Sequence, residues 1–261
     1  MRIATWNING IKARIDNLVT WLKEASPDVA LLQETKTVDD AFPREPLEAL
    51  GYNIAAHGEK GFNGVALLSK RPLQEVRFGL PGDGEDSQCR YVEGIVSSGA
   101  GVVRVASIYL PNGNPIGTAK FDYKLKWLGR LESHARDLLA LEEPFVLGGD
   151  YNVIPEPIDA KRPEAWVEDA LFQPQSRRAF RRLLALGLTD AVRAAGHGEG
   201  VYTFWDYQAG AWNKNNGIRI DHLLLSPQAA DRLISADIDR HTRAWVRPSD
   251  HVPVRADFDL P

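Results

Sequence analysis

Short apolar runs alternate with amphipathic segments along most of this chain. The apolar runs are enriched in β-branched and aromatic residues and are bounded by Gly, Pro, Asn or Asp, which is typical of strands. On this basis nine strands are predicted, over residues 3–6, 29–32, 52–56, 65–69, 91–96, 102–109, 145–147, 220–225 and 252–258.

Helices are predicted where apolar residues recur at spacings of three and four. The clearest is residues 119–141, in which Phe121, Leu125 and Leu128 share one face and Thr118 can cap the first turn. Three further helices are expected, over residues 15–24, 175–186 and 228–234. Many strands with a few helices favour stacked sheets covered by helices. Periodicity alone is compatible with either a doubly wound sheet or a two-sheet sandwich.

Composition narrows the class of protein. The chain has 261 residues, a net charge of −4 and 44% hydrophobic residues, which are ordinary values for a globular protein of one or two domains. Its one cysteine, Cys89, excludes an internal disulfide and a cysteine-based metal cluster, and fits a reducing cytosol. No stretch reaches the roughly 18 apolar residues of a membrane helix, and the N-terminus does not read as a signal peptide. We therefore expect a cytoplasmic protein without membrane contact.

Polar residues stand at the ends of several predicted strands, where an apolar core does not require them. They are Asn7, Asn9, Glu34, Tyr109, Asn112, Asp150, Asn152, Asp221, Asp250 and His251. Each alone has a structural explanation, such as a turn, a surface charge, a helix cap or a buried tyrosine. Because strand ends are where open sheets collect ligand sites, their joint occurrence predicts one shared pocket.

The residue types in this pocket indicate its chemistry. Carboxylates and amides are hard oxygen donors that suit Mg²⁺ or Mn²⁺ better than Zn²⁺. A spare carboxylate can orient or deprotonate water, and a histidine held by an aspartate can stabilise charge on a phosphoryl oxygen. The chain has neither a P-loop nor a dinucleotide-binding fingerprint. The prediction is metal-assisted hydrolysis of a phosphodiester.

Seven segments occur in an order that resembles a known family. They are WNINGIKAR, LLQETK, GFNGVALLSK, IYLPNG, GGDYNV, RIDHLLLS and PSDHVPV. This set resembles the exonuclease III family of DNA repair nucleases, within the endonuclease/exonuclease/phosphatase superfamily, from residue 2 to about residue 258. The resemblance implies a single domain, residues 1–261, with a four-layered α/β sandwich fold. Two mixed β-sheets would pack face to face, with helices outside and one active site at the sheet ends.

The resemblance also implies a metal site. Glu34 matches the principal Mg²⁺ ligand of the family, and Mn²⁺ is a possible substitute for Mg²⁺. The matching metal-site group as a whole comprises Asn7, Asn9, Glu34, Asp150, Asn152, Asp250 and His251. Some relatives carry an aspartate at the position of Asn9, so the resemblance does not extend to a second tightly held metal.

Catalytic roles follow from the same resemblance. Asp150 matches the residue that activates the attacking water, and Asn152 the residue that orients it. His251 matches a phosphate-contacting histidine, and Asp221 the carboxylate that holds it. Tyr109 matches a tyrosine that contacts the scissile phosphate. Asn112 is a second contact to that phosphate. Either Asp150 or Tyr109 transfers the proton.

Substrate recognition is assigned to an apolar pocket and a nearby loop. Phe204, Ile218 and Ile220 match the family's pocket for a sugar without a base, although each also fits a simple core. Such a pocket would admit an abasic deoxyribose, which costs less to flip out of the duplex than an intact nucleotide. Trp212 would contact DNA or anchor its loop. Two clusters would form a DNA-facing surface or a solvated helix face: Lys120, Lys124 and Lys126, and Arg177, Arg178, Arg181 and Arg182.

The predicted function is that of a Mg²⁺-dependent DNA repair nuclease. It would cleave the phosphodiester 5′ to abasic sites, and it would remove nucleotides or blocking groups from 3′ ends of double-stranded DNA. We expect a cytoplasmic monomer without an obligate protein partner, associated with the nucleoid when bound to DNA. Two alternatives remain: a phospholipid or phosphoinositide phosphodiesterase of the same superfamily, and a catalytically inactive DNA-binding module.

Overall fold

Two six-stranded β-sheets form the centre of the computed structural model, which describes residues 1–97, 99 and 101–260. In the first sheet the strand order is β11 (Leu233–Ile238), β12 (Val254–Phe258), β1 (Arg2–Asn7), β2 (Val29–Gln33), β4 (Val65–Ser69) and β3 (Asn53–His57). In the second sheet it is β5 (Leu73–Phe78), β6 (Tyr91–Ser97), β7 (Val102–Tyr109), β8 (Phe145–Asp150), β10 (Asp221–Leu225) and β9 (Thr189–Asp190). Both sheets are mixed, since β1 runs parallel to β2 and β7 runs parallel to β8 while the neighbouring pairs are antiparallel.

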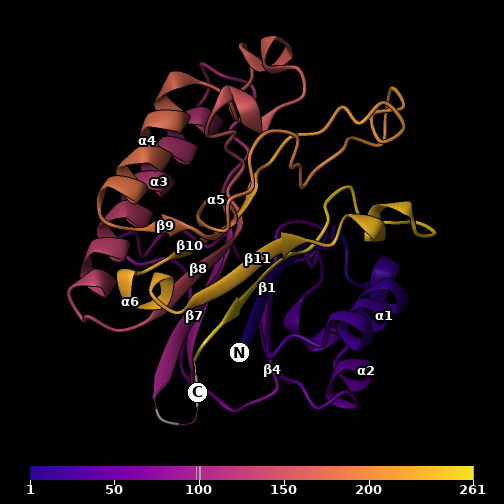
Figure 1. The fold of residues 1–261 in the computed structure, drawn as a ribbon, viewed down its shortest axis with the longest axis vertical. Coiled ribbons are helices and arrows are strands. Elements are labelled where there is room, and N and C mark those ends of the chain that lie inside the picture. Colours follow the sequence, from indigo (N-terminus) through magenta and orange to yellow (C-terminus); the bar gives the residue numbers. More distant parts are fainter. Residues whose placement is uncertain (98, 100, 261) are drawn as a thin grey trace.

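Helices cover the outer face of each sheet (Figure 1). On the first sheet lie α1 (Ile15–Ala25) and α2 (Glu45–Glu48), and on the second lie α3 (Ala119–Leu139) and α4 (Pro174–Ala185). Short helical turns complete the connections: α5 (Ala191–Ala194), α6 (Pro227–Ala230), η1 (Lys12–Arg14), η2 (Asp39–Ala41), η3 (Pro157–Asp159), η4 (Pro163–Trp166) and η5 (Arg240–Ala244). The result is the four-layered α/β sandwich predicted above.

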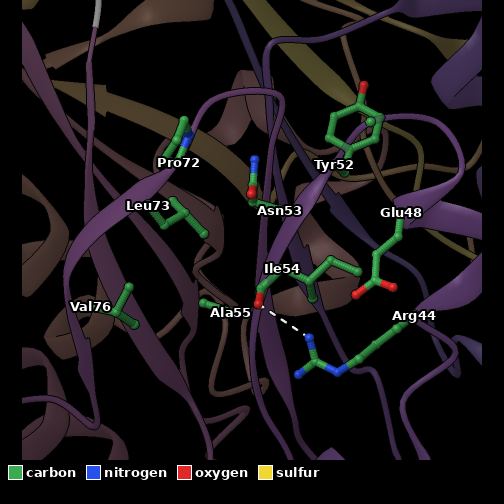
Figure 2. Close-up of a pocket in the computed structure, with 10 residues that line it drawn as sticks. Arg44, Glu48, Tyr52, Asn53, Ile54, Ala55, Pro72, Leu73 and Val76 are labelled. Atoms are coloured by element: carbon green, nitrogen blue, oxygen red, sulfur yellow. Dashed lines mark hydrogen bonds between the residues drawn. The ribbon is translucent and has the colours of Figure 1, made fainter.

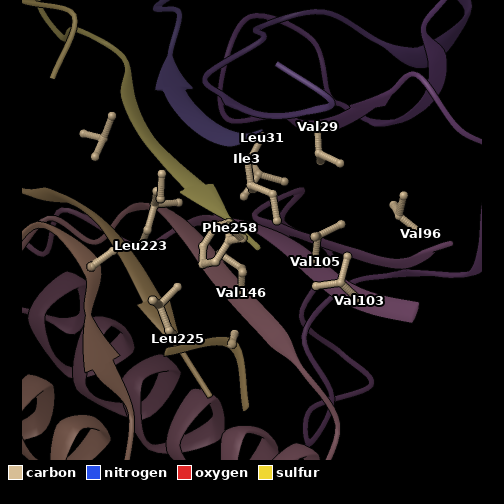
Figure 3. Packing of buried hydrophobic residues seen from close by; sticks show 14 of the residues in the cluster. Ile3, Val29, Leu31, Val96, Val103, Val105, Val146, Leu223, Leu225 and Phe258 are labelled. Carbon is tan, nitrogen blue, oxygen red and sulfur yellow. The ribbon is translucent and has the colours of Figure 1, made fainter. Parts of the chain in front are cut away.

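The central core lies between the sheets and follows the alternation of side chains along each strand. Ile3 and Leu31 of the first sheet belong to the same buried cluster as Val105, Val146 and Leu223 of the second sheet (Figure 3). Alternate residues of the same strands point outward. Because both faces of the central strands are covered, most of their residues are apolar, and polar residues gather toward the strand ends.

The long helix α3 shows how the outer layers are stabilised. Trp127, Leu128 and Leu131 lie on one face and are fully or almost fully buried against Ile108 and Leu147 of the second sheet. Each such side chain contributes about 1.5–3 kcal/mol by leaving water. The predicted helix over residues 119–141 is confirmed, and it ends at Leu139.

The arginines of α4 face solvent, as one of the two interpretations expected. Arg177 and Arg181 each form an ion pair with Glu156, at 2.9 and 3.0 Å, and Arg182 pairs with Glu132 at 2.7 Å. The apolar side chains of α4 pack against the sheet. The cluster is therefore part of a charged, salt-bridged helix face.

The predicted helix over residues 228–234 is wrong. Ser226 caps α6 by accepting a hydrogen bond from the Ala229 amide, but this helix ends at Ala230. Leu233 then begins β11, which pairs antiparallel with β12. A short apolar segment cannot be assigned by periodicity alone, and pairing with β12 makes this one a strand. The edge strand β5 was also not predicted, because most of its residues face solvent and form no apolar run.

Candidate active site

Strand register brings the polar strand ends together. Tyr109, Asp150 and Asp221 are direct neighbours across β7, β8 and β10. In the first sheet Asn7 pairs with Gln33, so Glu34 follows at the same end. The parallel strands end here, whereas their antiparallel neighbour β10 begins here. Residues from both sheets therefore meet at one end of the sandwich, as predicted.

A cavity of about 320 Å³ occupies this end of the molecule. Its walls are Glu34, Tyr109, Asn112, Asp150, Asn152, Trp166, Asp169, Leu171, Phe204, Asp206, Ile220, Asp250 and His251. Five of the predicted residues lie behind or beside these walls: Asn7, Asn9, Asp221, Ile218 and Trp212.

Asn7 ties two carboxylates together at the bottom of the site. Its amide nitrogen donates to Glu34 Oε1 at 2.8 Å and to Asp150 Oδ2 at 2.9 Å. Ligand atoms of Glu34, Asp150 and His251 lie within 4.8 Å of one another. The two carboxylates of this grouping fit a hard divalent cation, with the His251 ring beside them and space left in the cavity for a substrate phosphate.

Glu34 is held in its ionised form. Burial would raise the pKa of Glu34, but the charge of Lys36 and hydrogen bonds from Asn7 and Lys36 outweigh burial and lower it. The Lys36 ammonium lies 2.7 Å from Glu34 Oε2. Lys36 was not among the predicted site residues, although it stands two residues after Glu34 in the segment LLQETK.

His251 is oriented by Asp221 and faces Asp150. Its Nδ1 donates to Asp221 Oδ2 at 2.9 Å, and its Nε2 lies 3.8 Å from Asp150 Oδ2. Burial lowers the pKa of His251, but the carboxylates of Asp221 and Asp150 outweigh burial and raise it. The histidine is therefore an imidazolium at neutral pH, and its Nε2–H lies on the side of Asp150.

Asp150 has the properties of a proton acceptor. Complete burial raises the pKa of Asp150, which the charge of His251 partly opposes, while Asp221 and Glu34 raise it further. A carboxylate with a raised pKa accepts a proton near neutral pH more readily than an exposed one. The backbone N–H of Asn152 donates to Asp150 Oδ1 at 2.9 Å and fixes the orientation of that carboxylate.

Tyr109 is a neutral hydrogen-bond donor in this site. Burial and the nearby carboxylates of Glu34 and Asp150 raise the pKa of Tyr109 well above its ordinary value. The Arg90 guanidinium lies over the ring, 4.8 Å from its centre. Of the two predicted proton-transfer groups, the protonated phenol is suited to contact a phosphate and Asp150 is suited to accept a proton.

One wall of the cavity is apolar. Phe204 packs edge-on against the His251 ring, with centroids 4.9 Å apart, and Ile220 lies beside it. Ile218 pairs with Phe204 from behind. The same wall contains Trp166 and Leu171, which the sequence analysis did not identify because they lie in a segment without strand or helix periodicity.

Two predicted groups lie beside the central carboxylates. Asn9 donates to Asp250 Oδ1 at 2.9 Å, at the edge of the Glu34–Asp150–His251 group. Trp212 is half-buried, packs edge-on against Trp205 at 5.0 Å, and has the Arg240 guanidinium 4.9 Å above its ring. This packing fits a loop anchor, and contact of Trp212 with DNA stays a prediction.

A larger cavity of about 620 Å³ lies along β3, far from this chemistry (Figure 2). Arg44 and Glu48 are its charged residues, and Arg44 Nη1 donates to the Ile54 carbonyl at 3.3 Å (Figure 2). The carboxylate, amide and histidine groups converge in the smaller cavity at the strand ends, so that cavity is the candidate active site.

This two-sheet sandwich, with carboxylates, amides and a histidine converging at one end, is of a class that hydrolyses phosphate esters. Residues 4–251 match the Endonuclease/Exonuclease/phosphatase family, and the chain belongs to it. An exodeoxyribonuclease III from Haemophilus influenzae is 34% identical over 266 residues, covering 99% of this chain and 100% of that protein.

Solved structures agree with this assignment. An AP endonuclease from Archaeoglobus fulgidus shares the fold with a TM-score of 0.94 and 36% identity, covering 100% of both chains. A 3′–5′ exonuclease from Neisseria meningitidis gives a TM-score of 0.94 and 39% identity, covering 99% of this chain and 100% of that one.

Proposed function

We propose that this protein is a Mg²⁺-dependent DNA repair nuclease. It cleaves the phosphodiester 5′ to abasic sites, leaving a 3′-hydroxyl, and removes nucleotides or blocking groups from 3′ ends of double-stranded DNA. The observation that carries the proposal is the arrangement around Asn7, which holds Glu34 and Asp150 together while His251 faces them. The likeness to an exodeoxyribonuclease, an AP endonuclease and a 3′–5′ exonuclease supports DNA as the substrate.

Glu34 is the principal Mg²⁺ ligand in this proposal. Its neighbours in the metal-site group are Asn7, Asn9, Asp150, Asn152, Asp250 and His251, and Mn²⁺ is a possible substitute. When bound, the cation supplies Lewis-acid stabilisation of charge on the phosphoryl oxygens. The ionised state of Glu34 and its closeness to Asp150 support the assignment.

Asp150 accepts the proton of the attacking water, and Asn152 orients both groups. As the water oxygen bonds to phosphorus, the bond from phosphorus to the leaving 3′ oxygen breaks, and this oxygen takes a proton from solvent water to become the 3′-hydroxyl. His251, held by Asp221, places an N–H against the phosphoryl oxygen that gains charge. The phenol of Tyr109 and the amide of Asn112 hold the same phosphate from the opposite side of the cavity.

The apolar wall selects an abasic nucleotide. Phe204 and Ile220, backed by Ile218, border a cavity of about 320 Å³ that also contains the carboxylates. A deoxyribose without a base fits such a space, and turning it out of the duplex loses less stacking energy. Trp212 is proposed as a further DNA contact on the neighbouring loop.

The same site serves abasic cleavage and 3′-end trimming. Both reactions hydrolyse a phosphate ester at a 3′ oxygen of one strand, so one set of catalytic groups suffices. We further propose a single domain, residues 1–261, that acts as a cytoplasmic monomer without an obligate protein partner and is nucleoid-associated when bound to DNA. No described helix has the length and apolar character needed to cross a membrane.

A labelled duplex with one tetrahydrofuran abasic analogue tests the proposal. We expect cleavage at the analogue with Mg²⁺ and none with EDTA, together with stepwise shortening from the 3′ end. Binding of the duplex in a gel-shift assay without cleavage, in Mg²⁺ and in Mn²⁺, would instead indicate an inactive DNA-binding module. Absence of both cleavage and binding, with hydrolysis of a phosphoinositide or phospholipid, would indicate a phospholipid phosphodiesterase.

A further inference from the structure

Lys124 is a buried cation directly beneath the active site. It lies on α3 between Lys120 and Lys126, which are both exposed, whereas Lys124 itself has no solvent-accessible surface. The prediction that Lys124 lies on a DNA-facing or solvated surface is therefore wrong. Its ammonium group donates to the carbonyl oxygens of Pro111 at 3.1 Å, Asn112 at 3.1 Å and Asn152 at 2.6 Å. All three protons of the ammonium are therefore used on backbone carbonyls.

These carbonyls belong to two different loops. Asn112 follows β7 and Asn152 follows β8, and both side chains line the active-site cavity. The Asn112 amide donates to Asn152 Oδ1 at 3.3 Å, and the Asn152 amide donates to the Leu110 carbonyl at 2.9 Å. Lys124 thus binds the backbone of both residues, while their side chains contact each other in the active-site cavity.

The surrounding backbone leaves room for this lysine. Gly113 has a φ of +88°, and a Cβ at this position would lie 2.5 Å from Lys124 Cδ. Asn152 also has a positive φ, of +47°. Both loops therefore use residues that tolerate a positive φ where the backbone turns around the lysine.

Burying an ammonium group is costly, so its retention here calls for an explanation. Desolvation lowers the pKa of Lys124 to about 7, even though the carboxylates of Asp150 and Asp169 act in the opposite direction. An apolar side chain could fill the same space without this cost. Only a polar group can fix three carbonyls of two separate loops.

We propose that Lys124 is a positioning residue that sets Asn112 and Asn152 in the geometry needed to contact the scissile phosphate and the attacking water. This inference rests on the proposed function, because that function assigns these contacts to the two amides. Lys124 does not touch the substrate and acts only through the two loops. A displacement of about 1 Å in such groups can cost about 10²-fold in rate.

A Lys124→Met variant should lose much of its catalytic rate and keep most of its affinity for metal. We expect kcat on the abasic duplex to fall about 30-fold, within the range for misplaced groups. Mn²⁺ affinity measured by electron paramagnetic resonance should fall by less than about threefold, because Asn7 still holds Glu34, the principal ligand, and only the Asn152 loop is displaced. Arg136→Met is the control, since Arg136 also lies on α3, is 63% exposed and pairs with Glu132.

A double-mutant cycle shows whether Lys124 acts through the amides. In an Asn112→Ala/Asn152→Ala background, Lys124→Met should lower kcat by less than about threefold, since residues that act as a unit are non-additive. A full 30-fold further loss in that background, or a Lys124→Met protein with unchanged kcat, overturns the proposal. Unchanged cleavage by Asn112→Ala/Asn152→Ala alone would instead refute the role that the proposed function gives these amides.

Lys124→Arg provides a second variant that keeps the charge. A planar guanidinium cannot direct three protons at the same three carbonyls, so we expect a folded protein with a similarly reduced kcat. Circular dichroism and thermal melting establish folding for each variant. A folded Lys124→Arg protein with the original kcat would show that charge rather than positioning matters, and would overturn the inference.

Discussion

At the scale of single residues, the site depends on giving two nearby carboxylates different properties. Glu34 has a lowered pKa because Lys36 and Asn7 outweigh its burial. Asp150 has a raised pKa because it is completely buried near two other carboxylates. One carboxylate is therefore suited to hold a cation and the other to accept a proton, although both bond to the same amide of Asn7.

Replacing either carboxylate should abolish most of the activity. For Asp150→Asn we expect kcat on the abasic duplex to fall by about 10²–10⁴-fold, which is the usual contribution of a general base. Glu34→Ala should cause a loss of similar order and should also weaken Mg²⁺ binding. The exposed Asp231→Asn change is the control. Near-full turnover by Asp150→Asn would show that another group accepts the proton.

At the scale of elements, a buried ionic network supports the strand that carries Asp221. Arg219 precedes β10, and it donates to Asp159 at 2.6 Å and to Asp190 at 2.7 Å. Its Nη1 also lies 3.0 Å from His222 Nδ1. Arg219 thus connects the turn η3 and the strand β9 to the start of β10. These contacts fix the strand end that carries Asp221.

Removing this arginine should destabilise the fold in a pH-dependent way. Arg219→Met leaves the buried Asp190 without its guanidinium partner and Asp159 with Arg193 alone, for which we expect a loss of about 3–5 kcal/mol at neutral pH. Burial alone would raise the pKa of Asp190, but Arg219 and His222 lower it. The stabilisation is therefore present above the unfolded pKa of about 4 and is lost as pH falls below it.

Urea unfolding of both proteins at several pH values measures this effect. The difference between the original protein and Arg219→Met should be largest at neutral pH and should narrow below about pH 4, near the unfolded pKa of the carboxylates. A difference that stays constant across this range would mean that the arginine stabilises through packing rather than charge.

Close backbone contact between β7 and β8 also positions Asp150. A Cβ on Gly149 would lie 1.9 Å from the Ile108 carbonyl oxygen, which belongs to the backbone and cannot rotate away. Gly149→Ala should therefore force the two strands apart, costing about 1–3 kcal/mol or more. It should also displace Asp150 and lower kcat. Gly129→Ala on α3 is the control, because a Cβ there meets no atom within 4 Å.

At the scale of the whole molecule, the active site exists only when the two sheets are packed together. Asn7 and Glu34 come from the first sheet, whereas Tyr109, Asp150 and Asp221 come from the second. One continuous core of residues from both sheets fixes their relative position. The hydrogen bond from Asn7 to Asp150 crosses this interface and joins the two halves of the site.

A shared core predicts a single unfolding transition. Melting curves recorded by far-ultraviolet circular dichroism and by tryptophan fluorescence should coincide, because neither sheet can bury its inner face alone. Two separated transitions would show that the sheets unfold independently and that the chain is not one domain.

Removal of metal should leave the fold intact and lower its stability. The core between the sheets consists of apolar side chains rather than metal ligands, so the protein in EDTA should still melt cooperatively. Added Mg²⁺ should raise Tm by mass action, because at 100 times the dissociation constant it adds about 2.7 kcal/mol to the free energy of unfolding. In Glu34→Ala this shift should disappear. An equal shift in both proteins would place the bound cation elsewhere.

Most elements and residue types of the site could be predicted from local pattern. The helix over residues 119–141 was confirmed because its apolar spacing is long and regular. The helix over residues 228–234 was wrong because a short segment carries too little periodicity. Asn7, Glu34, Asp150 and His251 were identified because strand ends and motif order are visible in one chain.

The positions of the charged groups could not be predicted in the same way. Lys124 and Lys126 look alike in sequence, yet one is completely buried and the other is exposed. Trp166 reaches the active-site wall from a segment that has no regular structure beyond one short turn. Burial of these side chains depends on which distant loops cover them, and local spacing contains no information about that.

By itself, the sequence determined most of the elements of this protein and the residue types of its active site, because apolar periodicity and strand-end chemistry are local properties. Periodicity left the layers open, and only the family resemblance implied them. Only the tertiary structure decided which carboxylate keeps its charge, which lysine lies beneath the site and how the two sheets combine their strand ends. These features depend on desolvation and on distances between residues far apart in the chain, such as Asn7 and Asp150, which arise only when the sheets pack together.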